Sequence, residues 1–299
     1  MINNKQKGLN VLSLFDGMSC GQIALDKLGV KVDNYFASEI DKYAMQVTME
    51  NYPNTKQIGS VVDVRGEDLP NIDLMYGGSP CQGFSVAGKK LNFDDDRSKL
   101  FFEFVRVLKE TNPKYFLLEN VRMKQEWQDI VSEILGVKPI NINSSLLSPQ
   151  NRNRLYWTNI PNIKQPKDKC LMVADFLLTD FLDKYYMSEK ATKLIQDSLN
   201  KRNHNLDDFN IISSWQKNYT ISNKKCSAVT AAMGMGGGHV PMITELPYRK
   251  LTPIEIERMQ TVPDNYTDGV SDTQRYKMLG NGWTVDVIAH IFKNLKTIR

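Results

Sequence analysis

The sequence predicts an α/β protein with a doubly wound, mostly parallel sheet and a smaller, loop-rich subdomain. The first 160 residues alternate short apolar segments with helix-like segments, which is the pattern of repeated βαβ units. From about residue 165 to 247 this alternation stops, and asparagine, serine, lysine and glycine accumulate. Regular structure resumes from residue 248. We therefore expect a main domain over 1–164, a subdomain over 165–247 and a return to the main domain over 248–299.

Each element of the main domain has its own signal. Short apolar segments predict strands at 10–14, 34–38, 58–62, 72–76, 115–118 and 155–157. Helices are expected at 21–28, 41–51, 98–110 and 125–135. Asp41 is a suitable N-cap for the second of these helices, and the third carries apolar residues at helical spacing. In a doubly wound sheet, ligands bind at the carboxyl ends of the strands.

Two helices are expected after the subdomain. Thr252 is a suitable N-cap, with Pro253 at the first helical position and Glu255 at the third. A last helix is expected over 284–295.

Composition narrows the class of protein. Of the 299 residues, 41% are hydrophobic and 24% charged, which excludes disordered and collagen-like chains. No apolar run approaches the roughly 18–20 residues of a membrane span, and no signal peptide opens the chain. The four cysteines form no CxxC pair, so we expect free thiols, no metal site and a cytoplasmic protein. The net charge of +4 neither requires nor excludes a polyanionic partner.

The turn after the first strand is the first candidate site. In Phe15-Asp16-Gly17, continuing to Gly21, a glycine turn leads from a strand to a helix N-terminus, a common nucleotide-binding geometry. Asp16 would repel a pyrophosphate and suits a ligand with a cationic or zwitterionic end, such as an amino acid. The alternative is an ordinary turn between a strand and a helix.

Two carboxylates follow the next strands. Glu39 comes directly after the second strand, where doubly wound folds bind ribose hydroxyls, and Asp63 follows the third in the same way. Each alone could be a surface acid. Together with the first turn they describe an adenosine pocket with a charged tail, which S-adenosylmethionine fits.

A cysteine and a glutamate follow the fourth and fifth strands. Prolines and glycines around Cys81 hold it rigidly at a strand end, which predicts a nucleophile beneath a lid formed by 82–97, or else an incidental thiol. Glu119 at the end of the adjacent strand would lie close to it. A thiolate and a carboxyl are suited to attack on a pyrimidine ring. Arg152 and Arg154 then lie two residues apart in an extended segment, so their side chains are expected to point to the same side. The alternative is that they form an exposed basic strand edge.

These motifs, in this order, resemble those of the cytosine-carbon-5 DNA methyltransferases over nearly the whole chain. The matching segments are Phe15 to Gly21, with Ser19 in place of a second glycine, Ser79-Pro80-Cys81-Gln82, Glu119-Asn120-Val121, Gln150 with Arg152 and Arg154, Arg249 to Glu255, and Leu279 to Trp283. In its small recognition region and in the position of Trp283, the chain resembles phage and bacterial enzymes that are similar to the animal de novo methyltransferases. It corresponds to their catalytic domain only. The family includes enzymes of restriction-modification systems.

The resemblance implies a fold and a reaction. The fold is that of class I S-adenosylmethionine-dependent methyltransferases, with catalysis and cofactor binding in 1–164, target recognition in 165–247 and the rest of the catalytic domain in 248–299. A cytosine is flipped out of duplex DNA, Cys81 attacks its carbon 6, and carbon 5 receives the methyl group, leaving S-adenosylhomocysteine. Glu119 would stabilise the protonated ring nitrogen 3. Arg154 would bind the cytosine oxygen, and Arg152 would order the site.

The resemblance also implies binding residues. Those for the cofactor are Phe15, Asp16, Gly17, Gly21, Glu39, Ile40, Asp63, Val64, Pro80, Leu100, Asn281 and Trp283. Those for DNA are Gln82, Ser85, Val86, Ala87, Lys89, Lys217, Lys224, Lys225, Thr230, Gly236 and Gly237. Residues 201–250 contain seven basic and three acidic side chains, so this region alone carries the net charge of +4. Thr230 precedes a glycine run, but Ala228 stands where the family often has a first threonine.

Two other functions are compatible with the fold. One branch of the family methylates transfer RNA, but its Cys-Phe-Thr segment is absent from this sequence. A catalytically inactive nucleic-acid-binding relative would be expected to lack Cys81, Glu119 or Arg154, and all three are present. We expect a monomer that binds double-stranded DNA, without a membrane or a metal.

Overall fold

The chain folds into two compact units. The computed structural model describes residues 7–79, 96–201, 211–215, 218–222, 224–235, 239–244 and 248–295. The first unit consists of Met1–Ile142, Asn153–Gln165 and Val287–Arg299, and the second of Asn143–Arg152 and Pro166–Asp286. Each unit is described by itself below.

The units divide the chain differently from the three regions expected from the sequence. Residues 143–152 and 248–286 belong to the second unit by their contacts, together with most of the expected recognition region. The expected regions follow the order of motifs along the chain, whereas the units follow packing. The assignment of target recognition to residues 165–247 stays a prediction.

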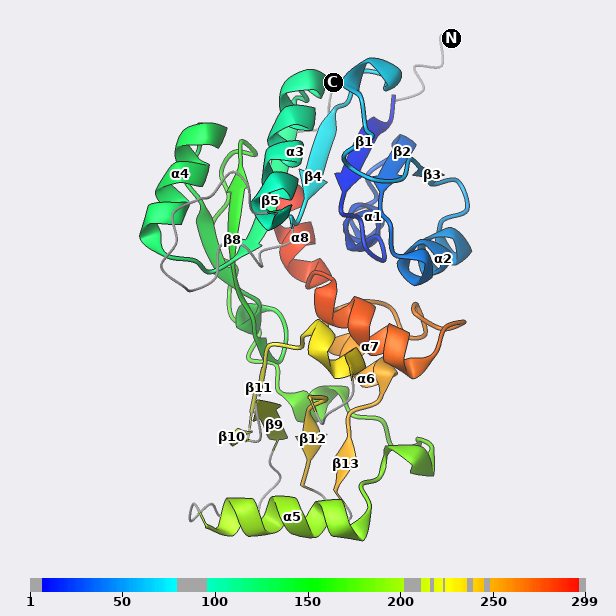
Figure 1. The fold of residues 1–299 in the computed structure, drawn as a ribbon, viewed down its shortest axis with the longest axis vertical. Helices are drawn as coiled ribbons and strands as arrows, with labels where there is room; N and C mark the ends of the chain where they lie inside the picture. Colours follow the sequence, from blue (N-terminus) through cyan, green and yellow to red (C-terminus); the bar gives the residue numbers. More distant parts are fainter. Residues whose placement is uncertain are drawn as a thin grey trace. The chain divides into compact units, whose positions relative to one another are not determined.

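The first unit contains a seven-stranded sheet with the order β3-β2-β1-β4-β5-β8-β6. The strands are β1 (Leu9–Leu14), β2 (Val32–Ser38), β3 (Lys56–Gln57), β4 (Leu74–Gly77), β5 (Tyr115–Val121), β6 (Ile140–Asn143) and β8 (Asn153–Thr158). Strands β3, β2, β1, β4 and β5 pair in parallel, and β8 is antiparallel to β5. The predicted mostly parallel α/β sheet is confirmed (Figure 1).

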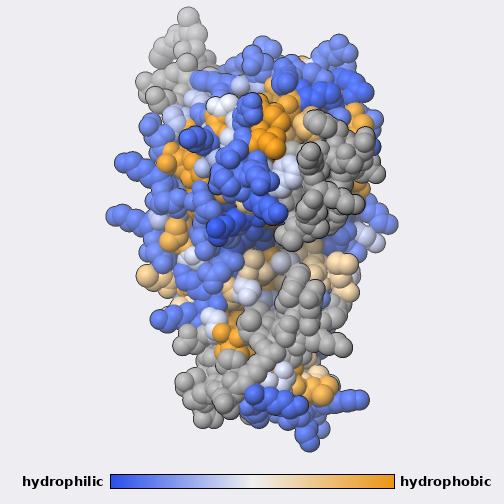
Figure 2. All heavy atoms as spheres, turned by 60° about the vertical axis from the view of Figure 1, so that its left-hand side comes forward, coloured by the Kyte–Doolittle hydropathy of each residue, from blue (hydrophilic) through white to orange (hydrophobic). Residues whose placement is uncertain are grey.

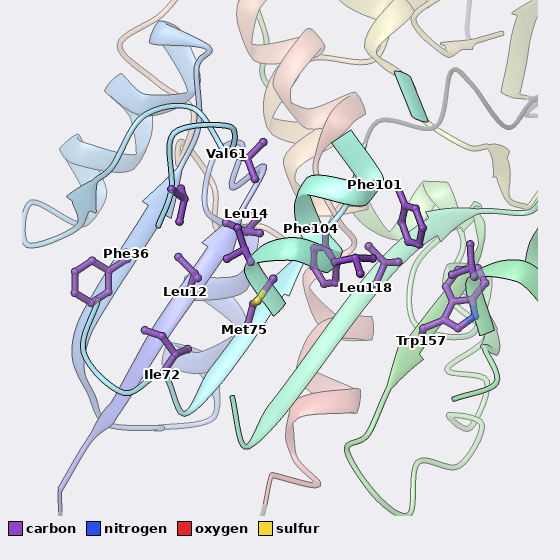
Figure 3. Packing of buried hydrophobic residues seen from close by; sticks show 14 of the residues in the cluster. Leu12, Leu14, Phe36, Val61, Ile72, Met75, Phe101, Phe104, Leu118 and Trp157 are labelled. Atoms are coloured by element: carbon purple, nitrogen blue, oxygen red, sulfur yellow. The ribbon is translucent and has the colours of Figure 1, made fainter. Parts of the chain in front are cut away.

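Helices pack on both faces of this sheet. They are α1 (Cys20–Lys27), α2 (Lys42–Asn51), α3 (Asp96–Thr111), α4 (Gln125–Leu135) and α8 (Val285–Phe292), with a short 3-10 turn η1 (Gly66–Asp68). On one face, Phe101 and Phe104 of α3 pack with Leu12, Leu14 and Met75 of the strands (Figure 3). On the other face, α1 and α8 contact Tyr76 of β4. The sheet is therefore doubly wound, as predicted.

One predicted strand is wrong, and several local signals are confirmed. Residues 58–62 do not form a strand, because Gly59 has a φ of +77° and turns the chain after β3. Asp41 caps α2 by accepting hydrogen bonds from the backbone N–H groups of Tyr43 and Ala44. Helix α4 occupies the predicted range 125–135.

The second unit has more regular structure than its composition indicates. Its strands are β7 (Gln150–Asn151), β9 (Ile211–Trp215), β10 (Asn218–Ser222), β11 (Cys226–Ser227), β12 (Met242–Ile243) and β13 (Arg249–Lys250). Its helices are α5 (Glu189–Asn200), α6 (Pro253–Met259) and α7 (Asp272–Asn281), with 3-10 turns η2 (Ser144–Leu146), η3 (Val173–Phe176), η4 (Asp183–Tyr185) and η5 (Ala231–Met235). Four strands pair in the order β10-β9-β12-β13, and β11 pairs with β7.

Helix α5 covers this small sheet but was not expected from the sequence. Its buried residues Ile195 and Leu199 pack against Ile212 of β9, Met242 of β12 and Tyr248. They lie four residues apart on one face of the helix, and Ser188 caps its N-terminus. The apolar spacing and the N-cap were present in the sequence, but the polar composition of the region led us to expect loops there.

Helix α6 begins with the predicted capping box. The Thr252 hydroxyl accepts from the Glu255 N–H, and the Glu255 carboxylate accepts from the Thr252 N–H at 2.7 Å. The same carboxylate forms two hydrogen bonds of 2.8 Å with the buried Arg249 guanidinium, whose face lies over the Phe181 ring. One buried acid therefore holds β13 and the start of α6 together.

Few large apolar side chains are exposed among the residues that the structure describes. In the described residues, no helix is long and apolar enough to cross a bilayer. On the face drawn in Figure 2, the coloured residues are mostly hydrophilic, and hydrophobic ones form small separate patches. The exposed large hydrophobic residues include Ile40, Val62, Leu182, Leu194 and Met235. Ile40, which is one of the predicted cofactor residues and directly follows Glu39, is 78% exposed.

We predict that Thr252→Ala lowers the free energy of unfolding by about 1–2 kcal/mol, because it removes the oxygen that caps α6. Chemical denaturation followed by circular dichroism measures this change. Thr252→Ser keeps the hydroxyl and is expected to lose much less. Equal losses in the two variants would contradict the capping role.

Candidate active site

The site is organised where the two central strands end side by side. Strands β1 and β4 are parallel neighbours, with Leu14 opposite Gly77. A Cβ atom at Gly77 would lie only 2.7 Å from the Leu14 carbonyl oxygen, so a residue without a side chain is needed there. The turn after β1 and the segment after β4 therefore leave the sheet next to each other. This is the switch point at which doubly wound folds bind ligands.

The turn after β1 has an unusual backbone. Phe15, Gly17 and Ser19 all have positive φ values, of 56°, 59° and 65°. Only glycine adopts this conformation without strain, and such conformations gather at functional sites. The side chains of the turn are largely inside: Asp16 and Ser19 are buried, and Phe15 is half-buried against the core.

Glu39 fixes this turn to the start of α2. One carboxylate oxygen, Oε2, accepts from the Gly17 N–H at 2.7 Å, and Oε1 accepts from the N–H groups of Ile40 and Asp41 at 2.7 and 2.8 Å. The carboxylate is thus oriented by three backbone donors; Oε1 uses both of its lone pairs on them, and Oε2 keeps one for a further donor.

Asp16 is a buried carboxyl group with one free oxygen. Its Oδ1 accepts from the Tyr35 hydroxyl at 2.7 Å, whereas Oδ2 has no hydrogen-bond partner in the described part of the chain. Desolvation raises the pKa of Asp16 from its ordinary value of 3.8 to about 6, although the hydroxyls of Ser13, Tyr35 and Ser19 oppose this rise. An ionised carboxylate in this place would be stabilised by a ligand that brings a cation.

The loop that carries Asp63 and Val64 is held by helix α3. The Arg106 guanidinium donates to the carbonyl oxygens of Val64 and Val61 at 2.9 and 3.1 Å. It is itself held by Glu103 and Glu110, at 2.7 and 2.8 Å. Val64 is buried and Asp63 is exposed, so the loop presents the Asp63 carboxylate to solvent. Leu100, on the same helix, is half-buried against the core.

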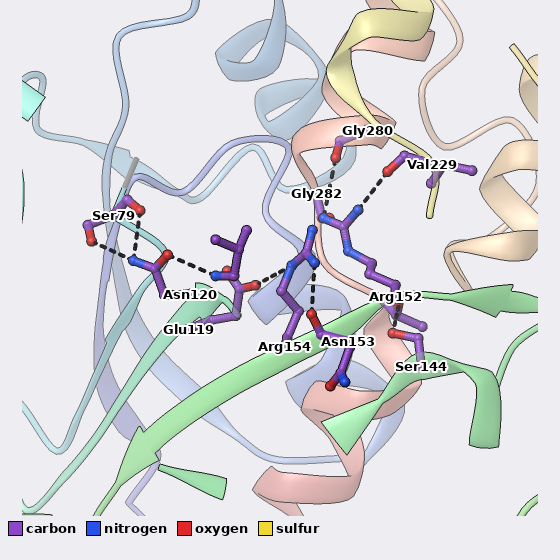
Figure 4. Close-up of polar contacts among 12 residues, drawn as sticks. Ser79, Glu119, Asn120, Ser144, Arg152, Asn153, Arg154, Val229, Gly280 and Gly282 are labelled. Carbon is purple, nitrogen blue, oxygen red and sulfur yellow. Dashed lines mark hydrogen bonds and ion pairs between the residues drawn. The ribbon is translucent and has the colours of Figure 1, made fainter. Parts of the chain in front are cut away.

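Glu119 and Arg154 form an ion pair at the ends of β5 and β8. The Arg154 Nε lies 3.0 Å from Glu119 Oε1, and both side chains are largely buried (Figure 4). The antiparallel register places Arg154 opposite Val121, two residues beyond Glu119. A fixed guanidinium beside the carboxylate therefore orients Glu119.

Asn120 links β5 to the segment that leads toward the predicted nucleophile. Its side-chain amide donates to the carbonyl and hydroxyl oxygens of Ser79, at 3.4 and 3.3 Å. Gly77 at the end of β4 lies opposite Leu118. The structure thus brings Ser79, two residues before Cys81, next to the segment that carries Glu119.

The two arginines of the predicted motif have different partners. Arg152 belongs to the second unit, where it is buried and donates to the carbonyl oxygens of Val229, Gly280 and Gly282, at 2.7, 3.3 and 2.8 Å (Figure 4). Its neighbour Gln150 contacts Val229, Met259 and Gln260. In this structure Arg152 ties together separate segments of its own unit.

The remaining predicted residues of the second unit lie in several places. Asn281 is exposed at the end of α7, and Trp283 is half-buried just after it. Lys224 is exposed, whereas the Lys225 ammonium donates to the Ser145 carbonyl and lies 3.4 Å from Asp168. Thr230 is half-buried, and a Cβ atom at Gly280 would collide with its backbone. Lys225 has partners within the protein and is a weaker candidate for a phosphate contact.

Several predicted residues lie outside the described part of the chain. These are Pro80, Cys81, Gln82, Ser85, Val86, Ala87, Lys89, Lys217, Gly236 and Gly237. Gly21 is described and lies in α1, where its missing side chain makes room for the Tyr76 ring. The missing side chain of Gly21 therefore serves packing next to the turn after β1, and its assignment to the cofactor stays a prediction.

Sequence reasoning missed three contributors to the site: Tyr35, Tyr76 and Arg106. The tyrosines look like ordinary apolar residues of buried strands, and Arg106 like one charge of an amphipathic helix. Only a tyrosine hydroxyl inside an otherwise apolar strand could have indicated a buried polar partner.

No group of three or more histidine, cysteine, aspartate or glutamate side chains suited to a metal ion occurs in the part of the chain that the structure describes.

Comparison with known proteins now identifies the class. The chain belongs to the C-5 cytosine-specific DNA methylase family, whose model matches residues 9–297. The family membership and class of enzyme predicted from the sequence are thereby confirmed.

Individual relatives agree with this membership. Type II methyltransferase M1.ScrFI of Lactococcus lactis subsp. cremoris is 31% identical, over 98% of this chain and 79% of that protein. Type II methyltransferase M.Bsp6I of Bacillus sp. is 30% identical, over 96% of this chain and 98% of its own length. The solved structure of Spodoptera frugiperda DNMT2 is similar with a TM-score of 0.71, covering 96% of this chain and 99% of that one at 19% identity, which supports the fold.

We predict that Asp16→Asn stabilises the protein without ligand near neutral pH. The folded-state pKa of about 6 lies above 3.8, so Asp16 favours the folded state when protonated, and this contribution is lost as the pH rises from about 4 to above 6. The difference corresponds to at most about 3 kcal/mol at pH 7. Thermal unfolding between about pH 5 and pH 8 should show a gain that grows with pH. A gain independent of pH would contradict this assignment.

Proposed function

We propose that this protein methylates carbon 5 of a cytosine in double-stranded DNA, with S-adenosylmethionine as the methyl donor. The observation that carries the proposal is the buried Glu119–Arg154 pair at the end of β5, next to the strand that leads through Ser79 toward Cys81. The relatives named Type II methyltransferases, at about 30% identity over nearly the whole chain, support the same reaction.

The residues around the β1 turn fit this cofactor. The buried Asp16 Oδ2, which has no hydrogen-bond partner among the described residues, suits the ammonium of the methionine part, and the oriented Glu39 carboxylate suits the ribose hydroxyls. The exposed Ile40 offers an apolar contact for the adenine, and Asp63 an acceptor for its amino group. Phe15, Gly17, Val64, Leu100, Pro80, Asn281 and Trp283 complete the proposed set. When bound, S-adenosylmethionine supplies an electrophilic methyl group.

Cys81 acts as the nucleophile in the proposed reaction. Its thiolate forms a bond to carbon 6 of cytosine, and the electron pair of the carbon 5–carbon 6 double bond becomes available at carbon 5 for the new bond to the methyl group. A base, for which water is a plausible acceptor, then removes the carbon 5 proton. The double bond forms again, the carbon–sulfur bond breaks, and the thiolate is restored.

Glu119 and Arg154 hold the ring during these steps. The Glu119 carboxylate accepts the hydrogen of protonated ring nitrogen 3, which makes carbon 6 more electrophilic. Arg154 orients Glu119 through their ion pair and has further N–H donors for the exocyclic oxygen of cytosine. Arg152 would order the site, as the family resemblance implies; its own contacts hold segments of the second unit together.

This chemistry requires a base that has left the helix. The plane of a stacked base is not accessible to a thiolate, so the target cytosine is flipped out. Residues 82–97 would close over it, with Gln82, Ser85, Val86, Ala87 and Lys89 near the DNA. Lys217, Lys224, Lys225, Thr230, Gly236 and Gly237 would contact the duplex from the recognition region, and phosphate contacts by lysines make binding sensitive to salt.

We predict that the protein transfers a labelled methyl group from S-adenosylmethionine to duplex DNA and not to transfer RNA. Cys81→Ala should abolish transfer while cofactor binding is retained, because the thiolate acts on the base and not on the cofactor. Cys170→Ala, which changes an exposed free cysteine, is the matched control and should keep activity. Substantial activity of Cys81→Ala would overturn the mechanism, and transfer to RNA alone would overturn the substrate.

We also predict that duplex DNA containing 5-fluorocytosine traps a covalent complex through Cys81. The fluorine cannot leave as a proton does, so the carbon–sulfur bond persists after methyl transfer. A denaturing gel would show a slower band with the wild-type protein and none with Cys81→Ala. Absence of this band, while unmodified DNA is methylated, would count against covalent catalysis.

A further inference from the structure

Asp16 lies at the end of a chain of buried hydroxyl groups that the sequence motifs do not include. The Tyr76 hydroxyl donates to the Tyr35 hydroxyl at 2.7 Å, and the Tyr35 hydroxyl donates to Asp16 Oδ1 at 2.7 Å. The Ser19 hydroxyl also donates to Tyr35, at 3.3 Å. Because a carboxylate only accepts, the direction of the chain is fixed from Tyr76 through Tyr35 to Asp16.

The sheet builds this chain from three adjacent strands. Tyr35 on β2 lies opposite Val11 of β1, and Tyr76 on β4 lies opposite Ser13 of β1, so both rings stand on the same face of the sheet. Helix α1 covers that face, and only a glycine at position 21 leaves room for the Tyr76 ring. The Phe292 ring of α8, with its centre 5.4 Å away, closes the other side of Tyr76.

All three groups are taken out of water. Tyr35 is 4% exposed, Tyr76 is fully buried and Asp16 is 9% exposed. Burying two hydroxyls and a carboxyl is unfavourable unless each is hydrogen-bonded. Apolar residues at positions 35 and 76 would avoid the cost of burying polar groups. Because tyrosines are present instead, we expect the hydrogen-bonded hydroxyls to have a role besides packing.

We propose that Tyr35 and Tyr76 are positioning residues for cofactor binding: they hold Asp16 by its Oδ1 and leave Oδ2 for the ammonium group of the methionine part. This inference rests on the proposed function. Tyr35 donates directly to the carboxylate, and Tyr76 polarises Tyr35 and strengthens that bond.

Among the described residues, no cationic side chain contributes to the field at Asp16. The groups that face it are the hydroxyls of Ser13 on β1, Ser19 before α1 and Tyr35 on β2, together with the Glu39 carboxylate after β2. Behind them, Cys20 of α1 and Tyr52 after α2 face Tyr76. The Ser13 and Ser19 hydroxyls do not complete a hydrogen bond to Oδ2. A ligand ammonium would therefore be the cation that balances Asp16.

This arrangement has a consequence for pH dependence. The ammonium binds the ionised form of Asp16, so affinity is expected to fall as the pH decreases through about 6, where the raised pKa of the free protein lies. The Tyr35 hydroxyl stabilises the carboxylate and lowers its pKa. Removing this hydroxyl raises the pKa further, so the loss of affinity should move to higher pH.

The test measures binding of S-adenosylhomocysteine by titration calorimetry from about pH 5 to pH 7, where an α-amino group of ordinary pKa is largely protonated. The variants are Tyr35→Phe and Tyr76→Phe, with Tyr115→Phe as a matched control on β5, outside the chain of hydroxyls. At pH 7, Tyr35→Phe should weaken binding by about ten- to a hundredfold, as expected for a hydrogen bond to a charged group. Tyr76→Phe should weaken it less, and both should move the midpoint of the pH profile upward.

A second ligand separates positioning from a general structural effect. The compound 5′-methylthioadenosine shares the adenosine part but has no amino acid end, so its affinity should be the same in all variants and at each pH. Equal weakening of both ligands, or an unchanged pH midpoint in Tyr35→Phe, would overturn this inference while the proposed function stands. Failure of the wild-type protein to bind S-adenosylhomocysteine at all would instead overturn the proposed function, and this inference with it.

Discussion

Strands β1 and β4 approach each other so closely that their shared end has no space for a side chain at Gly77. That contact fixes where the turn after β1 and the segment after β4 leave the sheet, and the other parts of the first unit are arranged around it. Glu39 then binds the turn from the neighbouring strand, and Asn120 binds Ser79 from the strand on the other side. Groups from four consecutive parallel strands thus meet at one edge because their backbones are in register.

The same edge contains groups that do not favour the folded state by themselves. The positive φ values of Phe15 and Ser19 in the β1 turn and the desolvated carboxyl group of Asp16 both oppose folding. The apolar core beneath, from Leu12 to Trp157, supplies the stability that such a turn needs (Figure 3). Interactions that are unfavourable in the free protein become favourable when a ligand supplies the missing partner, which is how binding sites are commonly prepared in advance.

Local signals in the sequence were reliable where the responsible atoms lie close together in the chain. The Asp41 cap and the Thr252–Glu255 capping box depend on residues two or three positions apart, and both occur. The strand expected over 58–62 failed at one glycine, because apolar content does not reveal the sign of φ. The Tyr35–Tyr76 contact joins residues 41 positions apart and depends on the strand order β2-β1-β4. A single sequence does not contain that order, so the polar chain could not be predicted from it.

The second unit is built from two separate pieces of chain, and this affects how it could be exchanged between relatives. The short piece 143–152 contributes β7, which pairs with β11, and Arg152, which binds the carbonyl oxygens of Val229, Gly280 and Gly282. A transplanted segment 166–286 would therefore arrive without the strand and the guanidinium that its own backbone requires. A chimaera that also carries 143–152 from the same parent keeps these contacts. The unit of exchange in this protein is discontinuous, and one of its boundaries falls between Arg152 and Asn153, next to the Arg154 that pairs with Glu119.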